Sequence, residues 1–162
     1  VRFDLTAGEN VAVGRIEAAA DADRIAAAAA RGLAAPVIER LPEGYAQPLG
    51  KRFAGGLDLS GGEWQKVALS RAYMREAEIL ILDEPTAALD AQAEHDVFAP
   101  FRVLSAGRTA VLISHRFSTV RMADRILVLE GGRLLEAGSH AGLMARGGRY
   151  AELFTLQAEG YR

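Results

Sequence analysis

The sequence lacks cysteine, long apolar runs and a strong net charge of either sign. The absence of cysteine excludes disulfide bonds and thiolate metal sites, and it is compatible with a reducing compartment. No apolar run approaches the ~18 residues that a membrane-spanning helix needs. The formal net charge of −2 provides no electrostatic basis for binding nucleic acid, and we expect none as a partner.

The length and composition suit one folded domain. The 162 residues are 50% hydrophobic and 25% charged, which is typical of a globular rather than a disordered chain. The opening segment Val1–Phe3 does not begin with methionine and resembles sequence from the interior of a domain. We therefore expect the chain to be a fragment of a longer protein.

The stretch around two adjacent acids is the most informative part of the sequence. An apolar run, Ile79–Leu82, predicts a buried parallel strand that ends at Asp83 and Glu84, and Pro85 follows. Because open α/β sheets bind ligands at the carboxyl ends of their strands, these acids indicate a metal and a water. We assign Mg²⁺ to Asp83, and the orientation or deprotonation of an attacking water to Glu84. On this pattern alone, a buried strand capped by solvated acids is about equally compatible.

A second motif, Leu59–Glu63, predicts the start of a helix. Ser60 is placed as its N-cap, and Glu63 completes a capping box three residues later. Gly61 and Gly62 occupy the first turn, although a glycine in a helix costs roughly 1 kcal/mol relative to alanine. We interpret the glycines as exposing N–H donors and the helix dipole to an anion such as phosphate. The alternative is a tight turn, for which one glycine would be enough.

Capping signals and hydrophobic periodicity predict the remaining elements. Residues 1–77 are expected to form a helical subdomain, with helices at 6–14, 22–31, 37–41 and 63–76 and a loop at 42–58. Residues 78–138 are expected to supply part of a mostly parallel sheet, with strands at 78–82, 109–113 and 125–129, helices at 91–104 and 118–122, and a hairpin return at 133–136. Residues 139–162 are expected to form C-terminal helices, separated at Gly147 and Gly148. The predicted buried positions are Trp64, Val67, Ala68, Ala72, Tyr150, Leu153, Phe154 and Leu156. The polar residues of the helix at 63–76 are expected on its other, mostly solvated faces, and these are Gln65, Lys66, Arg71 and Arg75.

Four motifs in this order resemble those of the nucleotide-binding domain of ABC-type ATPases, the motors of ABC transporters. Leu59–Glu63 is similar to the family's signature motif, and Ile79–Thr86 is similar to its Walker B strand with the catalytic glutamate. Ala88–Asp90 resembles the D-loop, and Ile113–Arg116 resembles the segment that carries the switch histidine. The resemblance implies an α/β fold of the P-loop NTPase type, present as an incomplete domain, with ATP and Mg²⁺ as ligands.

The resemblance implies that two such domains enclose ATP between them. Ser60, Gly61 and Gly62 would contact the γ-phosphate of ATP held by the partner domain, and Glu63 completes the matched motif. Asp90 would cross the dimer interface and help to position the other site.

The resemblance also implies the chemistry at the acid pair. Asp83 would bind Mg²⁺, and Glu84 would polarise the attacking water. His115 would bridge the γ-phosphate and Glu84 and so sense hydrolysis.

Weaker similarities favour an exporter over an importer. Residues 41–52 resemble the loop that faces the membrane domain in exporters, and residues 131–140 and 148–154 resemble an exporter tail. The resemblance thus implies two kinds of partner, transmembrane domains and a second nucleotide-binding domain, at the cytoplasmic face of the cell membrane. The alternatives are a soluble ABC-type ATPase that acts on DNA or ribosomes, and a non-catalytic regulatory half-domain.

The sequence departs from the family because it has no G-x-x-x-x-G-K-[ST] loop, which holds the β- and γ-phosphates. The Q-loop glutamine and the aromatic residue that stacks on adenine are also missing. In the family, all three precede the part that is matched here. We therefore expect that the complete protein is an ATPase, but that this chain alone neither binds ATP tightly nor hydrolyses it.

Overall fold

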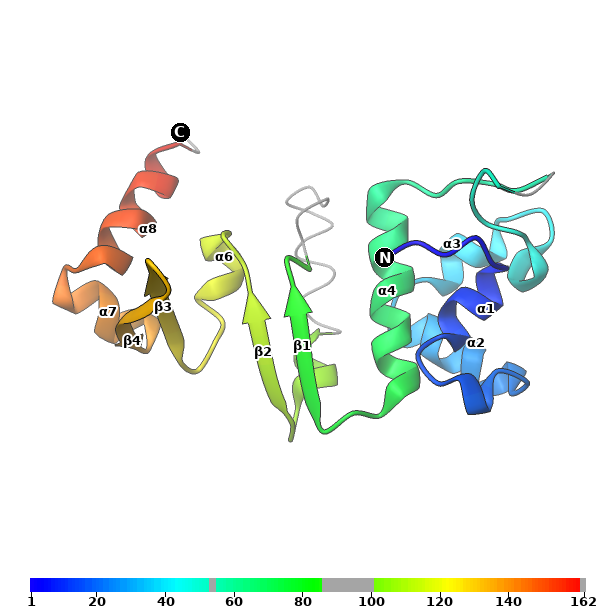
Figure 1. Cartoon of the computed structure of the whole chain (residues 1–162), viewed down its shortest axis with the longest axis horizontal. Helices are drawn as coiled ribbons and strands as arrows, with labels where there is room; N and C mark the ends of the chain where they lie inside the picture. Colours follow the sequence, from blue (N-terminus) through cyan, green and yellow to red (C-terminus); the bar gives the residue numbers. More distant parts are fainter. Residues whose placement is uncertain (53–54, 86–100, 161–162) are drawn as a thin grey trace. The chain divides into compact units, whose positions relative to one another are not determined.

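The computed structural model describes residues 1–52, 55–85 and 101–160 (Figure 1). Asp90 and most of the helix predicted at 91–104 lie outside these residues. None of the helices in the described part of the chain combines the length and apolar character that crossing a bilayer requires.

In chain order the elements are α1 (Ala7–Ala12), the 3₁₀ turn η1 (Ile16–Ala18), α2 (Ala22–Arg31), α3 (Ala35–Glu39), the 3₁₀ turn η2 (Gly44–Ala46), α4 (Gly61–Arg75), β1 (Ile79–Asp83), β2 (Thr109–Ile113), α6 (Phe117–Val120), β3 (Ile126–Glu130), β4 (Arg133–Gly138), α7 (His140–Arg146) and α8 (Arg149–Gly160).

The described residues form two compact units. Unit 1 contains residues 1–80 and 101–110, and unit 2 contains residues 81–85 and 111–160. Unit 1 is mainly helical and carries α1 to α4. Unit 2 carries α6, the β3–β4 pair, α7 and α8, and it includes the ends of β1 and β2.

Local capping signals form the first two helices of unit 1 as the sequence predicts. The Thr6 hydroxyl accepts a hydrogen bond from the Glu9 N–H at 3.2 Å, and the Glu9 carboxylate accepts one from the Thr6 N–H at 2.9 Å. Asp21 caps α2 by accepting a hydrogen bond from the Arg24 N–H at 3.0 Å. Helix α3 begins two residues before its predicted start, because Pro36 is compatible with the first turn of a helix.

Helix α4 has 15 residues and begins with the second predicted capping box. The Ser60 N–H donates to the Glu63 carboxylate at 2.7 Å, and the Glu63 N–H donates to the Ser60 hydroxyl at 3.4 Å. The helix starts at Gly61 rather than at Glu63, so both glycines belong to its first turn. It ends before Glu76, whose φ of +47° is the left-handed conformation that commonly follows a helix.

The core of unit 1 lies where α4 packs against α1 and α2. Trp64 and Val67 are buried as predicted, but Ala68 is exposed, so that prediction is wrong. Spacing defines which residues share a helix face, whereas the neighbouring helices decide which face is covered. The buried apolar side chains of this core include Val11, Ile25, Ala29, Ile38, Leu49, Trp64, Val67, Leu69, Tyr73, Met74, Leu80 and Leu104.

Arg71 is half-buried and lies at the edge of this core, unlike Arg75, which is exposed on the same helix. Its guanidinium donates to Oδ1 of Asn10 at 2.6 Å, to the backbone oxygen of Asn10 at 2.7 Å and to that of Val1 at 2.7 Å. Burial lowers the pKa of Arg71. Asn10 is fully buried, and its amide donates to the backbone oxygens of Phe3, Leu5 and Thr6. The pair therefore ties α4 to α1 and to the residues before it.

Strands β1 and β2 form a two-stranded parallel sheet (Figure 1). The Thr109 N–H donates to the Glu78 oxygen at 3.3 Å, and the Glu84 N–H donates to the Ile113 oxygen at 2.9 Å. Residue numbers thus rise in the same direction along both strands, and both strands end at the same edge. Strand β2 spans the predicted residues, and β1 is shifted by one residue.

Strand β1 is not buried on both faces, contrary to the prediction. Leu80 is 5% exposed and belongs to the core of unit 1, but Ile79 and Ile81 are 62% and 70% exposed. Alternate side chains of a strand point to opposite faces, and the described residues cover only the face of Leu80.

Strands β3 and β4 form the predicted hairpin and pair antiparallel. The pairing begins with Ile126 opposite Gly138 and ends with Glu130 opposite Arg133, next to the turn. Gly131 and Gly132 have φ of +57° and +75°, which a two-residue hairpin turn requires. Among the described residues β3 pairs with β4 and not with β2, so the expected joining of this strand to the parallel sheet is wrong. The short turn places β4 beside β3, so the backbone N–H and C=O groups along that edge of β3 bond to β4.

The core of unit 2 is small and forms mainly around α8. Tyr150 is buried together with Ile126 and Leu143, and Phe117 and Phe154 pack against them. Helices α7 and α8 are separated at Gly147–Gly148 as predicted. Leu156 is 58% exposed, so its predicted burial is wrong.

Candidate functional site

Glu84 follows the last residue of β1 and has an unusual backbone conformation. Its φ is +47°, which is uncommon for a residue other than glycine and costs about 1–3 kcal/mol. The hydrogen bond from its N–H to the Ile113 oxygen holds the backbone against the end of β2. The left-handed turn thereby moves the half-buried Glu84 side chain out of the strand's alternation and over the sheet edge. Such conformations are concentrated at functional sites.

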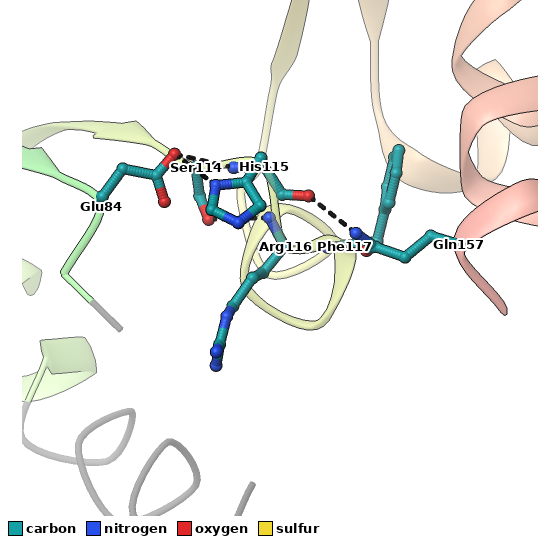
Figure 2. A network of polar contacts seen from close by, with 6 residues as sticks. All are labelled: Glu84, Ser114, His115, Arg116, Phe117 and Gln157. Carbon is teal, nitrogen blue, oxygen red and sulfur yellow. Dashed lines mark hydrogen bonds and ion pairs between the residues drawn. The ribbon is translucent and has the colours of Figure 1, made fainter. Parts of the chain in front are cut away.

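His115 lies two residues beyond β2 and contacts Glu84 (Figure 2). Its Nδ1 is 2.7 Å from Oε1 of Glu84, and its backbone N–H donates to the same oxygen at 3.2 Å. An ionised carboxylate can only accept hydrogen bonds, so Nδ1 must carry the proton in this contact. The other ring nitrogen, Nε2, is then left to meet a second group. The structure therefore brings the two predicted catalytic residues together.

The loop after His115 is fixed by hydrogen bonds to its backbone. The Ser114 hydroxyl accepts a hydrogen bond from the Arg116 N–H at 3.0 Å. Gln157 of α8 donates from Nε2 to the His115 backbone oxygen at 3.1 Å and accepts at Oε1 from the Phe117 N–H at 2.9 Å (Figure 2). Sequence reasoning missed Gln157, because a single glutamine in a helix has no distinctive pattern.

Asp83 is exposed at the end of β1, one residue before Glu84. No cluster of three or more His, Cys, Asp or Glu side chains suited to a metal occurs among the described residues. Mg²⁺ commonly binds one or two carboxylates and completes its shell with water and substrate phosphates, so a single exposed carboxylate fits this ion.

The segment Ser60–Glu63 belongs to unit 1, whereas Asp83, Glu84 and His115 belong to unit 2. Ser60 is exposed, and the N–H groups of Gly61 and Gly62 are at helix positions that have no acceptor within the helix. Glu63 is occupied by the capping box and also pairs with Arg40. Glu63 therefore supports the start of the helix rather than offering a free carboxylate. Asp90 lies outside the described residues.

Comparison with known proteins identifies the family. The family model for ABC transporters matches residues 3–87. The chain is 44% identical over 157 residues to an ATP-dependent lipid A-core flippase of Thiobacillus denitrificans, an alignment that covers 97% of this chain and 26% of the relative. It is 46% identical over 160 residues to an ATM1-type heavy metal exporter of Novosphingobium aromaticivorans, covering 98% of this chain and 25% of the relative.

A solved structure agrees with these relatives. A bacterial Atm1-family ABC exporter with ATP bound superposes with a TM-score of 0.87 at 44% identity, over 98% of this chain and 27% of that chain. The fold is accordingly that of part of an ABC ATPase domain. The chain spans about a quarter of the length of these proteins. Since the family model covers more than half of its residues, this chain belongs to the ABC transporter family.

Proposed function

We propose that the chain is the C-terminal part of the nucleotide-binding domain of an ABC exporter, and that the complete protein couples ATP hydrolysis to transport across a membrane. The observation that carries the proposal is the contact between Glu84 and His115 at the common end of two parallel strands. An acid and an imidazole in contact at that edge are suited to orient a water and to respond to a phosphate. The naming of the relatives as a flippase and an exporter supports export.

Glu84 orients the attacking water or accepts its proton. Its backbone is held by β2 and its carboxylate by His115, so the direction of the carboxylate is fixed before substrate binds. His115 presents Nε2 to the γ-phosphate while Nδ1 remains on Glu84. Asp83 would hold Mg²⁺, and the ion would supply positive charge that offsets the charge of the phosphates.

The signature segment, Ser60–Glu63, binds the γ-phosphate of the ATP that a partner domain holds. Ser60 provides a hydroxyl, and Gly61 and Gly62 provide N–H donors at the positive end of the α4 dipole. Glu63 maintains these donors by capping the helix. Asp90 crosses the interface between the two domains. The partners are therefore a second nucleotide-binding domain and transmembrane domains, with this chain at the cytoplasmic face.

We further propose that the chain consists of three parts. Residues 1–77 form the helical subdomain with the signature, residues 78–138 form part of the ATPase core, and residues 139–162 form C-terminal helices. Because the sequence contains no P-loop, this chain alone lacks the cradle for the β- and γ-phosphates. Calorimetric titration of the purified chain with Mg·ATP should therefore give no binding at micromolar concentrations, and micromolar affinity would contradict this point.

The substitution Glu84→Gln in the complete transporter tests the proposed role of Glu84. The amide keeps the shape of the side chain but is a far weaker base, so the ATPase rate should fall by about 10²–10⁴-fold while ATP binding is retained. Glu159→Gln, an exposed position on α8, is the matched control and should hydrolyse ATP at the wild-type rate. Unchanged turnover by Glu84→Gln would rule out the assigned chemistry.

A further inference from the structure

Gln157 makes two hydrogen bonds to the loop that carries His115, and both are to its backbone. The amide nitrogen donates to the His115 oxygen at 3.1 Å, and the amide oxygen accepts from the Phe117 N–H at 2.9 Å. A backbone oxygen can only accept and a backbone N–H can only donate, so these partners determine the orientation of the amide. One side chain thus spans the backbone from His115 to Phe117 (Figure 2).

The loop needs this support because its own helix provides little. Helix α6 has only four residues, and its N-cap, Arg116, makes no side-chain capping hydrogen bond. The N–H of Phe117, the first helical residue, has no acceptor within the helix. Gln157 supplies that acceptor from α8, 40 residues further along the chain.

Helix α8 is itself anchored beside the loop by aromatic contacts. The Phe117 ring lies 5.4 Å from that of Tyr150 and 5.3 Å from that of Phe154, measured between ring centroids, and both pairs are edge-to-face. Tyr150, Phe154 and Gln157 are four and three residues apart, so they share one face of α8. This face of α8 therefore contacts Phe117 in two ways, by packing against the Phe117 ring and by accepting a hydrogen bond from the Phe117 N–H.

We propose that Gln157 is a positioning residue for His115. It fixes the backbone of residues 115–117 so that both donors of His115 meet Oε1 of Glu84. The catalytic consequence of this inference rests on the proposed function, in which His115 and Glu84 act on ATP. Loss of Gln157 should leave nucleotide binding in place but let the imidazole sample unproductive orientations.

The steady-state ATPase kinetics of the complete transporter test the inference. Gln157→Leu keeps the volume near the aromatic residues but removes both hydrogen bonds, and kcat should fall roughly tenfold with KM for ATP within about twofold. Gln157→Glu keeps the acceptor for the Phe117 N–H but loses the donor to the His115 oxygen. Its kcat should therefore lie between that of the wild type and that of Gln157→Leu. Glu159→Ala, two residues along the same helix, is the matched control and should retain the wild-type kcat.

A double-mutant cycle separates positioning from a general structural effect. If Gln157 acts through the His115 loop, Gln157→Leu should lower kcat less in the His115→Ala background than in the wild type, because only the backbone N–H then remains to be misplaced. Independent, multiplying losses would overturn the proposal, as would a wild-type kcat in Gln157→Leu. Hydrogen exchange of the peptide covering residues 114–120 should accelerate in Gln157→Leu and remain unchanged in Glu159→Ala. Unchanged exchange of this peptide in Gln157→Leu would also overturn it, whatever the activity of that variant.

The two proposals fail in different ways. If Glu84→Gln stalls turnover while Gln157→Leu is fully active, only the role of Gln157 is wrong. If Glu84→Gln turns over normally, the proposed function is wrong, and the hydrogen-exchange measurement still decides whether Gln157 holds the loop.

Discussion

A single oxygen of Glu84, Oε1, is contacted by two donors of His115, the backbone N–H at 3.2 Å and Nδ1 at 2.7 Å. Only the second contact depends on the imidazole. The backbone of the loop therefore contributes to orienting the carboxylate independently of the imidazole, and the ring has a second nitrogen, Nε2, to which the proposed function assigns the γ-phosphate. His115 therefore has two roles, one of its backbone N–H and one of its imidazole, and substitutions can distinguish them.

Replacing His115 by alanine should reduce catalysis without releasing Glu84 completely. The loss of one hydrogen bond to a charged group, worth about 1.5–3 kcal/mol, predicts a decrease in kcat of roughly 10- to 100-fold in the complete transporter. Arg121→Ala, an exposed position after α6, is the control and should keep the wild-type kcat. A fully active His115→Ala variant would remove the imidazole from the mechanism.

Replacing Ser60 by aspartate should separate the capping of α4 from phosphate binding. Aspartate caps helices about as well as serine, so the thermal stability of the chain should be maintained. Its negative charge would repel the γ-phosphate, so the ATPase activity of the complete transporter should fall at least about tenfold. The exchange Asp21→Ser at the cap of α2 is the matched control, because it alters a cap that has no assigned role in binding. Full activity of Ser60→Asp would contradict the role of the signature.

Acid should destabilise unit 1 partly through Glu76. Its hydrogen bond and charge interaction with Arg24, and the nearby Arg15, hold the pKa of Glu76 below its ordinary value of 4.5. A carboxylate whose pKa is lowered by folding stabilises the protein above its ordinary pKa, and this contribution is lost as the pH falls further. The melting temperature of Glu76→Gln should therefore fall less than that of the wild type between about pH 5 and pH 3. An identical decline in both would show that the contacts of Glu76 do not contribute.

Replacing Arg71 by alanine should destabilise unit 1 strongly. The change removes three hydrogen bonds and leaves Oδ1 of the fully buried Asn10 without this donor, which predicts a loss of about 2–4 kcal/mol of unfolding free energy. Arg71→Lys should recover only part, because a lysine cannot form the forked contact with Asn10. Arg75→Ala, exposed one helical turn later, is the control for denaturant unfolding. Equal stability of the two alanine variants would contradict the structural role of Arg71.

The sequence by itself determined the features that depend on neighbours three or four residues apart. The caps at Thr6, Asp21 and Ser60 formed as predicted, because a side chain that accepts an N–H three residues later needs no distant partner. The turn at Gly131–Gly132 likewise fixed the hairpin. The order of the four motifs indicated the family, and the parallel strand ends placed Glu84 and His115 at one edge.

Only the tertiary structure decided which partners come from far along the chain. Gln157 bonds to a residue 42 positions away and Arg71 to one 61 positions away, and no local pattern marks either of them. The same reason explains the wrong predictions for Ala68, Leu156 and the exposed face of β1. Periodicity defines which side chains share a face, but burial depends on what that face meets, and this is settled only when the elements pack together.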